Sequence, residues 1–274
     1  DCTAEAPRLT ISVTRLEQLS PALLELGCPA RVYIPLEEVS RLESLPGEGP
    51  EWCAVLPRVW RDRDEPALRT LLERARALGF TGVLIGNLGH LPLVRGLNFH
   101  LYGDYGLNVF NSRSLAYLKD KELESACVSF ELRFAQIRDL KKVLRAEAIV
   151  YGRLPLMITE NCLVQNETGC RLDRQGPCVP EDGPCRCGQP NVLVDRTGAA
   201  FPLLPAYGHR TEIQNSKPLY LADRPEHRRL GLAYARLRFT TETAEECVSV
   251  VQNYLDAAPA AGDFTRGLYE RGVE

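Results

Sequence analysis

Apolar and polar positions follow a repeating order along the chain, in which a short apolar run precedes a segment with helical spacing. The run LTISV at residues 9–13, for example, is followed by leucines that recur on one face of a helix. The clearest helix spans residues 64–79, where an aspartate cap and an early proline precede periodic leucines and a final glycine. The apolar runs predict eight strands, at residues 9–13, 30–35, 53–57, 81–87, within 99–111, 127–133, 148–156 and 234–240.

Eight strand–helix units in one chain predict an α/β fold, a closed (β/α)8 TIM-like barrel. The runs are rich in Val, Ile and Leu without strict alternation, as expected for strands that are covered on both faces. A doubly wound open sheet fits the same alternation, and the count of eight favours the barrel. Two helices carry start signals: Ser112 is a candidate cap, and Thr243 with Glu246 forms a candidate capping box.

A long interruption separates the seventh and eighth predicted strands. It is rich in Gly, Pro, Cys and Asn, and it is far longer than an ordinary loop. Inside it, residues 193–205 predict a hairpin that turns at Thr197 and Gly198. We expect one domain overall, with barrel units one to seven at 1–156, a Cys-rich insertion at 157–224, and the last unit at 225–274. The insertion leaves the carboxyl end of strand seven, which is the catalytic face of a barrel.

Composition is that of a globular protein, with 45% hydrophobic and 25% charged residues among 274. The formal net charge of −3 excludes the overall basic field of a non-specific nucleic-acid binder, although a local basic groove stays compatible with it. No apolar run reaches the length of a membrane span, so we expect no membrane association. The chain starts at Asp1 without a signal segment; we expect a cytoplasmic protein and a fragment of a longer one. Nothing in the pattern predicts the oligomeric state.

Half of the ten cysteines lie between residues 160 and 190. Their spacing contains no CxxC pair, which argues against a zinc ribbon and against a bacterial ferredoxin motif. Disulfides are one alternative, and a nucleophilic cysteine beside His209 is another. The grouping itself favours a metal or iron–sulfur site. The grouped residues are Cys162, Cys170, Cys178, Cys185 and Cys187, whereas Cys28, Cys53, Cys127 and Cys247 fit buried free thiols.

Polar side chains at the carboxyl ends of the predicted strands are candidates for chemistry. Glu131 is either a general base or the partner of an arginine, and Arg153 and Arg133 clamp a carboxylate or phosphate or form structural ion pairs. Tyr105 and Tyr151 either stack on a base or pack at the rim. No HExxH or GxSxG motif occurs to support a hydrolase. We predict Glu131, Arg153 and Asp104 as catalytic residues, and Asn87, Tyr105, Asn108, Arg133 and Tyr151 as substrate-binding residues.

Several stretches resemble the peptidase U32 family, the collagenase-like proteases, in the branch that often carries a DUF3656 region. YGRLPLMITENC at 151–162 and GDYGLNVFNS at 103–112 are the first of these. Others are SFELR at 129–133, LVDRTGAAFPLL at 193–204, NSKPLYLAD at 215–223 and FTRGLYERGV at 264–273. The resemblance covers most of residues 9–273 and implies a barrel with a four-ligand iron–sulfur cluster (4Fe-4S) beside its mouth.

The same resemblance implies the cluster ligands. Cys162 and Cys170 occupy the first two positions, and Cys187, with Cys185 as the rival, occupies the third. The family's fourth cysteine falls where this chain has His209. Either His209 is a ligand, or a spare cysteine (Cys178 or Cys185) fills the place, or the cluster has three ligands. Zinc is an alternative occupant after aerobic preparation.

The resemblance also implies a reaction, because members look like oxygen-independent hydroxylases of RNA bases or of a quinone precursor. Some RNA-directed members take the hydroxyl group from prephenate. The expected function is therefore hydroxylation of an RNA base in rRNA or tRNA, with a prephenate-like hydroxyl donor. The alternatives are the peptidase of the family label and a non-catalytic module held by a structural metal.

Overall fold

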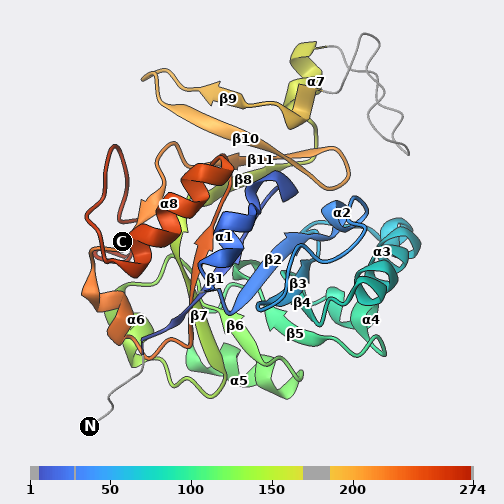
Figure 1. Cartoon of the computed structure of the whole chain (residues 1–274), viewed down its shortest axis with the longest axis horizontal. Coiled ribbons are helices and arrows are strands. Elements are labelled where there is room, and N and C mark those ends of the chain that lie inside the picture. The colour runs from blue at the N-terminus through green and yellow to red at the C-terminus, as the bar shows by residue number, and fades with distance from the viewer. Residues whose placement is uncertain (1–5, 28, 169–185, 273–274) are drawn as a thin grey trace. The chain divides into compact units, whose positions relative to one another are not determined.

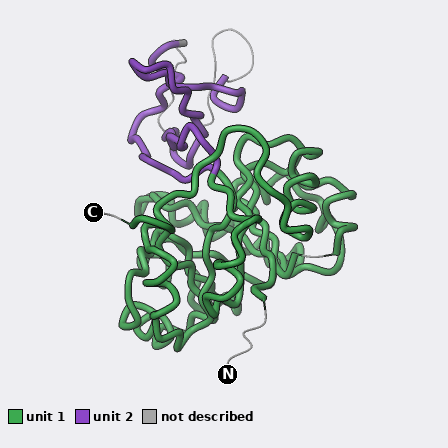
Figure 2. Tube along the Cα trace, turned by 90° about the vertical axis from the view of Figure 1, so that its left-hand side faces the viewer, with its two compact units in different colours: residues 1–152, 219–274 green, residues 153–218 purple. Residues whose placement is uncertain are grey.

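The computed structural model describes residues 6–27, 29–168 and 186–272. The chain divides into two compact units, which are drawn in different colours in Figure 2. Unit 1 consists of Asp1–Gly152 and Leu219–Glu274, and unit 2 is Arg153–Pro218. The division therefore lies at residues 152 and 219, a few residues before each predicted limit of the Cys-rich insertion.

Unit 1 is a closed barrel of eight parallel strands (Figure 1), which confirms the predicted (β/α)8 fold. The strands follow the order β7-β13-β1-β2-β3-β4-β5-β6, and pairing of β6 with β7 closes the ring. A further short strand, β12, runs antiparallel to the carboxyl end of β7. The strands are β1 (Arg8–Ser12), β2 (Arg31–Pro35), β3 (Glu51–Val55), β4 (Gly82–Ile85), β5 (His100–Gly103), β6 (Ser125–Cys127), β7 (Arg145–Gly152), β12 (Leu219–Tyr220) and β13 (Tyr234–Arg238).

Helices connect successive strands, and only some of the predicted caps are confirmed. Asp64 precedes α3 as predicted, but its side chain makes no capping hydrogen bond to that helix. In α3, Leu68, Leu72 and Ala75 form the buried face, and Gly79 ends the helix with φ of +99°. In α8 the predicted capping box is confirmed. The helix predicted from residue 112 does start there, but Asn111 caps it, not Ser112. The α-helices of unit 1 are α1 (Pro21–Glu25), α2 (Leu36–Val39), α3 (Glu65–Leu78), α4 (His90–Val94), α5 (Ser112–Asp120), α6 (Phe134–Asp139) and α8 (Ala244–Leu255), and the 3₁₀ helices are η1 (Leu16–Gln18), η2 (Asp62–Asp64), η3 (Tyr105–Leu107) and η5 (Pro225–Arg229).

Side chains alternate along each strand between the barrel interior and the surrounding helices. In β2, Arg31 and Tyr33 point inward and bond residues of distant strands, whereas Val32 and Ile34 are buried on the other face. Charged and aromatic side chains therefore occupy much of the interior. The interior of a TIM barrel is ordinarily filled by Val, Ile and Leu. In unit 1 much of the apolar core lies instead between the strands and the helices.

Two strand predictions were wrong at their ends. The sixth strand was predicted at 127–133, but β6 ends at Cys127 and the chain then turns through residues 129–133. The seventh was predicted at 148–156, but β7 covers Arg145–Gly152. Gly152 ends it with φ of +115°, a conformation that β-strands do not use. The apolar residues after it belong to the first strand of unit 2.

Unit 2 is a four-stranded antiparallel sheet in the order β8-β11-β10-β9. The predicted hairpin is confirmed as β9 and β10, whose turn Asp195 stabilises by accepting bonds from the backbone N–H groups of Thr197 and Ala199. Two short helices, at 163–168 and 186–188, lie on either side of the break in the described residues. The elements of unit 2 are β8 (Pro155–Thr159), α7 (Leu163–Thr168), η4 (Arg186–Gly188), β9 (Asn191–Val194), β10 (Ala200–Ala206) and β11 (Arg210–Gln214). No helix in the described part of the chain is long and apolar enough to cross a membrane.

Gly152 allows a close approach that no other residue would permit. A Cβ atom at this position would lie 1.9 Å from the carbonyl oxygen of Arg238. Gly49 has the same φ of +115°, yet a Cβ atom there would meet nothing within 4 Å. The pair therefore separates steric clash from backbone strain.

We expect Gly152→Ala to lower the free energy of unfolding by about 3 kcal/mol or more, because the clash adds to the strain. Gly49→Ala should cost only about 1–2 kcal/mol, the strain alone. Urea unfolding of both variants measures the difference. Equal losses in the two variants would show that the contact with Arg238 is unimportant.

Candidate functional site

The centre of the barrel holds a buried group of charges around Arg236 of β13. Its Nη1 donates to Asp104 Oδ1 at 2.5 Å, and its Nε donates to Glu147 Oε2 at 3.1 Å. Burial opposes the charge on Arg236, but attraction by Glu147 and Asp104 outweighs burial and raises its pKa. The predicted catalytic residue Asp104 therefore lies directly after β5, with its carboxylate bound to an arginine of β13, beyond β6 and β7 in the ring.

Glu147 of β7 is satisfied by two further donors. Thr10 Oγ1 and Tyr33 OH donate to its Oε1 at 2.6 Å and 3.1 Å. Burial, followed by the nearby charge of Glu147, raises the pKa of Tyr33, so this phenol stays protonated. Each buried charge thus has a partner of opposite charge or a hydrogen-bond donor, which is the condition for burying a carboxylate.

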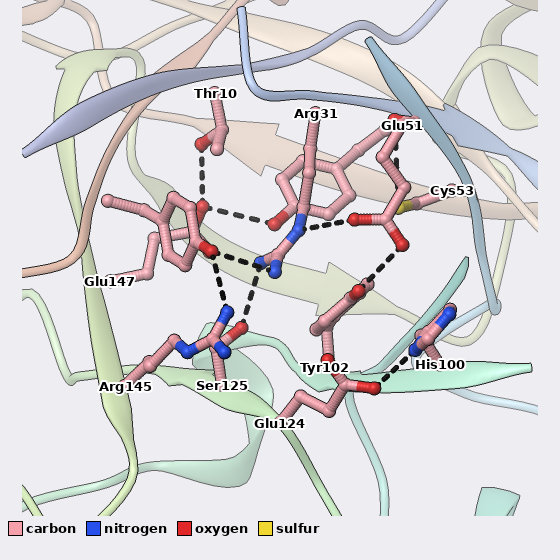
Figure 3. Close-up of polar contacts among 12 residues, drawn as sticks. Thr10, Arg31, Glu51, Cys53, His100, Tyr102, Glu124, Ser125, Arg145 and Glu147 are labelled. Atoms are coloured by element: carbon pink, nitrogen blue, oxygen red, sulfur yellow. Dashed lines mark hydrogen bonds and ion pairs between the residues drawn. The ribbon is translucent and has the colours of Figure 1, made fainter. Parts of the chain in front are cut away.

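A second polar layer closes the amino end of the barrel (Figure 3). The guanidinium of Arg31 lies between two aromatic rings, 3.6 Å from the centroid of Tyr102 and 4.1 Å from that of Tyr234. It donates to Glu51 and to Ser125, both at 2.9 Å. Since Arg31, Glu51, Ser125 and Tyr234 are the first residues of their strands, this layer lies away from the catalytic face and stabilises the fold.

The carboxyl end of the barrel carries an aromatic residue near two cations. Tyr105 begins η3, and the guanidinium carbons of Arg58 and Arg238 lie 5.6 Å and 5.9 Å from its ring centroid. Phe130 packs on Tyr105 with its centroid 5.8 Å away. Two cations at the barrel mouth favour an anionic group such as a carboxylate or phosphate.

Tyr151, predicted to bind substrate, lies in a buried aromatic cluster with Tyr220, Phe239 and Tyr254. Its hydroxyl donates to Glu242 Oε1 at 3.1 Å. The ring therefore packs against other aromatic side chains, in keeping with the packing alternative for Tyr151. Glu242, in the loop after β13, adds a buried carboxylate to this side of the barrel.

Other predicted site residues have different surroundings. Glu131 was expected to follow a buried strand, but the chain turns before it and its side chain is exposed. Asn108 is exposed at the end of η3, and Arg133 is exposed at the start of α6. Arg153 belongs to unit 2, where its Nη1 donates to the carbonyl oxygen of Asn215 at 3.1 Å.

A cavity of about 820 Å³ opens at the carboxyl ends of β3, β4 and β5. It contains the predicted residue Asn87, whose side-chain oxygen accepts a bond from Gly89 N at 2.8 Å. The cavity is confined to unit 1. Its lining residues are Arg58, Gly86, Asn87, Leu88, Gly106, Leu107, Asn111, Arg113, Ser114, Tyr117 and Leu118.

In unit 2 the turn that carries Cys162 is held by β11. Arg210 donates from Nε and Nη2 to the two carboxylate oxygens of Glu160, at 3.2 Å and 3.1 Å. Thr211 Oγ1 accepts a bond from Leu163 N at 3.0 Å. The buried thiol of Cys162 thus lies on a fixed turn at the start of α7.

Cys187 lies in η4, which contacts α7. A deprotonated cysteine is the form that binds a metal or cluster, and Cys162 and Cys187 are candidates for that role. Cys170, Cys178 and Cys185 lie outside the described residues, and the residues that are described contain no group of three His, Cys, Asp or Glu side chains that could hold a metal. His209 follows β10 in the turn to β11, with φ of +60°. The donor chemistry at the two described cysteines fits an iron–sulfur cluster.

Three histidines of unit 1 bond to groups other than nucleophiles. His90 Nε2 lies 3.1 Å from the carbonyl oxygen of Pro57, His100 pairs with Glu124, and His227 Nδ1 bonds the carbonyl oxygen of Arg224. The thiols of Cys53, Cys127 and Cys247 are buried, and burial raises the pKa of each, as the assignment to the core predicted. None of these three histidines is hydrogen-bonded to one of these three thiols, as a catalytic pair of histidine and cysteine would require.

The sequence analysis missed Arg58, Glu147, Arg236, Arg238 and Glu242. A signal was present for two of them, because YARLRF places arginines at alternate positions of an apolar strand. Such a pattern predicts charged side chains on the inner face of the barrel. Glu147 is a single charged residue before an apolar run, and Arg58 and Glu242 stand in loops, so none of these three has a distinctive pattern.

Arg236→Met should lower the free energy of unfolding by about 3–5 kcal/mol, because it leaves two buried carboxylates without their cation. Asp104→Asn keeps an acceptor for Arg236 and leaves the pair with Glu147, so its loss should be much smaller. Urea unfolding at neutral pH compares the two variants. An equal loss would contradict the central position of Arg236.

His90 provides a test of pH dependence, since burial lowers its pKa to about 4. As the pH falls, His90 of the unfolded chain takes up a proton near pH 6.5, whereas His90 of the folded chain does so only near pH 4. The free energy of unfolding is therefore unaffected by His90 above pH 6.5, and we expect it to fall by roughly 3 kcal/mol as the pH drops from 6.5 to 4. Urea unfolding across this range should give a shallower pH dependence for His90→Gln than for the wild type, and parallel curves would refute the assignment.

Comparison with known proteins places the chain in a family. The profile of peptidase family U32 matches residues 45–191. Among solved structures, the U32 peptidase Mk0906 is 9% identical with a TM-score of 0.45, covering 87% of this chain and 96% of that chain. A thiamine phosphate pyrophosphorylase from Pyrococcus furiosus is 8% identical with a TM-score of 0.38, covering 91% and 96%. No curated protein matches. Because the family profile spans more than half of its residues, the chain belongs to peptidase family U32.

Proposed function

We propose that this U32 protein is an iron–sulfur enzyme that hydroxylates an RNA base without molecular oxygen. The observation that carries the proposal is the placement of Cys162, directly before α7, and of Cys187, in η4, because α7 and η4 contact one another. Cys170, and either His209 or Cys185, would complete a four-ligand site. A bound cluster would supply one-electron transfer.

The barrel mouth supplies the groups that such a reaction needs for binding. Arg58 and Arg238 beside Tyr105 suit an anionic hydroxyl donor of the prephenate type or a phosphate of the RNA. Asp104 is fixed by Arg236 at the end of β5 and can accept a bond from a substrate N–H or O–H group. Exchange of a base C–H for C–OH takes the hydroxyl group from a prephenate-type donor as hydroxide: the donor's C–O bond breaks, its ring carboxylate leaves as carbon dioxide, and its ring becomes aromatic. One proton and two electrons then remain to be removed, the electrons to an oxidised electron carrier.

The contacts of the histidines support this proposal over the peptidase of the family label. The three in unit 1 bond backbone carbonyls or Glu124, and not a serine or cysteine nucleophile. Polar groups at the mouth are arginines, a tyrosine and paired carboxylates. This set favours the binding of an anion over the activation of a nucleophile.

The test compares wild type, Cys162→Ser and Cys247→Ser after anaerobic purification. Wild type and Cys247→Ser should be brown, with broad visible absorption and equal iron and sulfide contents. Cys162→Ser should lose most of both, since Cys162 is a proposed ligand whereas Cys247 is a buried thiol of α8. A colourless, zinc-loaded wild type would favour the structural-metal alternative.

The substrate is tested in a strain that lacks the gene. Mass spectrometry of its rRNA and tRNA should show the loss of one hydroxylated nucleotide, restored by wild type and by Cys247→Ser but not by Cys162→Ser. An unchanged modification profile would refute RNA hydroxylation. Gelatin hydrolysis that persists in Cys162→Ser would favour the peptidase.

A further inference from the structure

The cavity beside the barrel mouth is built from three loops of the catalytic face. Arg58 follows β3, Gly86 and Asn87 follow β4, and Gly106 with the first turns of α5 follows β5. Apart from Asn87, the sequence analysis assigned none of its lining residues to substrate binding. The cavity is therefore a distinct feature beside the proposed reaction site.

Two glycines determine the path of Arg58 along the cavity. A Cβ atom on Gly106 would lie 2.6 Å from the carbonyl oxygen of Gly86, so these loops touch without room for a side chain. Carbon atoms of the Arg58 side chain lie 3.1 Å and 3.4 Å from the same Cβ position, and 3.7 Å from the one on Gly86. The stem of Arg58 thus runs over both glycines, and its charged end lies beside Tyr105.

The lining residues carry positive charge only. Arg58 and Arg113 contribute two guanidinium groups, and no aspartate or glutamate is among the lining residues. The charge comes from these arginines and not from the start of α5, where Asn111 already accepts bonds from Arg113 N and Ser114 N at 3.0 Å. In a chain of net charge −3, a cavity of this kind selects an anion.

An exposed aromatic ring adjoins these cations. Tyr117 is 48% exposed and lies four residues after Arg113 on α5, so the two side chains share one helix face about one turn apart. An unstacked base can stack on an exposed tyrosine while neighbouring arginines bind its phosphate. Lys121 Nζ lies 5.3 Å from the centroid of the same ring, and a simple inorganic anion would not contact the exposed part of the ring.

We infer that this cavity binds a nucleotide, with its phosphate at Arg58 and Arg113 and its base on Tyr117. Where the nucleotide belongs to an RNA chain, the inference rests on the proposed function and assigns the cavity to a residue that flanks the modified base. A free nucleotide would present the same chemistry. Binding at this cavity would then hold the flanking nucleotide while the target base lies at the mouth.

The experiment measures binding of a fluorescein-labelled single-stranded heptaribonucleotide and of uridine 5′-monophosphate. The proteins are wild type, Arg113→Gln, Tyr117→Ala and the control Lys119→Gln, which removes an exposed charge of α5 outside the cavity. Arg113→Gln should reduce the slope of log affinity against log salt by about 0.7, the value for one phosphate contact of a single strand. Tyr117→Ala should weaken binding roughly fivefold or more with the slope unchanged. Lys119→Gln should match wild type.

If only the heptaribonucleotide binds, the ligand is a nucleotide within an RNA chain. If uridine 5′-monophosphate also binds and the two variants weaken its binding equally, the ligand is a free nucleotide. The inference is overturned if wild type binds neither probe, or if Arg113→Gln and Tyr117→Ala bind like wild type. Its failure differs from that of the proposed function. If Arg113→Gln and Tyr117→Ala weaken binding but no hydroxylated base is found, nucleotide binding at the cavity stands and the proposed reaction is refuted. If a hydroxylated base is found but the variants bind like wild type, only nucleotide binding at the cavity is refuted.

Discussion

The ion pairs of Arg236 with Glu147 and Asp104 constrain the whole barrel. These residues come from β13, β7 and the end of β5, so the contacts join different parts of the ring. A charge buried here without its partners would cost several kcal/mol, which makes any register that separates them unfavourable. The pairing therefore selects one arrangement of the strands. The packing of aliphatic side chains against the helices could be met by several arrangements.

The same ion pairs determine what the catalytic face can offer. Arg236 binds Asp104 from within the barrel. The next residue, Tyr105, lies near Arg58 and Arg238. The amino end is filled by Arg31 and its two tyrosines, which leaves the carboxyl end as the open one. A polar interior thus connects stability to the site, because the residues that stabilise the barrel also orient those at its mouth.

The sequence predicted the eight strands and the barrel because short, mainly apolar runs alternate with segments of helical spacing, and both patterns are local properties of the chain. It misplaced the ends of β6 and β7, where a turn at 129–133 and the conformation of Gly152 interrupt apolar runs. Asp104 and Tyr105 were recognised from their place at a strand end. Arg236 and Glu147 were not, since the search followed strand ends and their pairing depends on register between strands far apart in the chain.

Residue roles were harder to predict than positions. Glu131 and Arg153 had the right chemistry for a site, but a turn exposes the first and unit 2 uses the second to hold backbone carbonyls. Whether a charged side chain reaches the mouth depends on one or two backbone angles after the strand. Local sequence patterns do not specify those angles.

The pairing of Gly152 with Leu219 gives unit 2 a property of its own. The chain leaves the barrel at one residue of this antiparallel pair and returns at the other, so the barrel meets the whole excursion as a single hairpin connection. The entropy of closing such a connection rises only with the logarithm of its length. The cysteine-bearing unit can therefore be lengthened, shortened or replaced during evolution without a change in the strand pairing that closes the barrel.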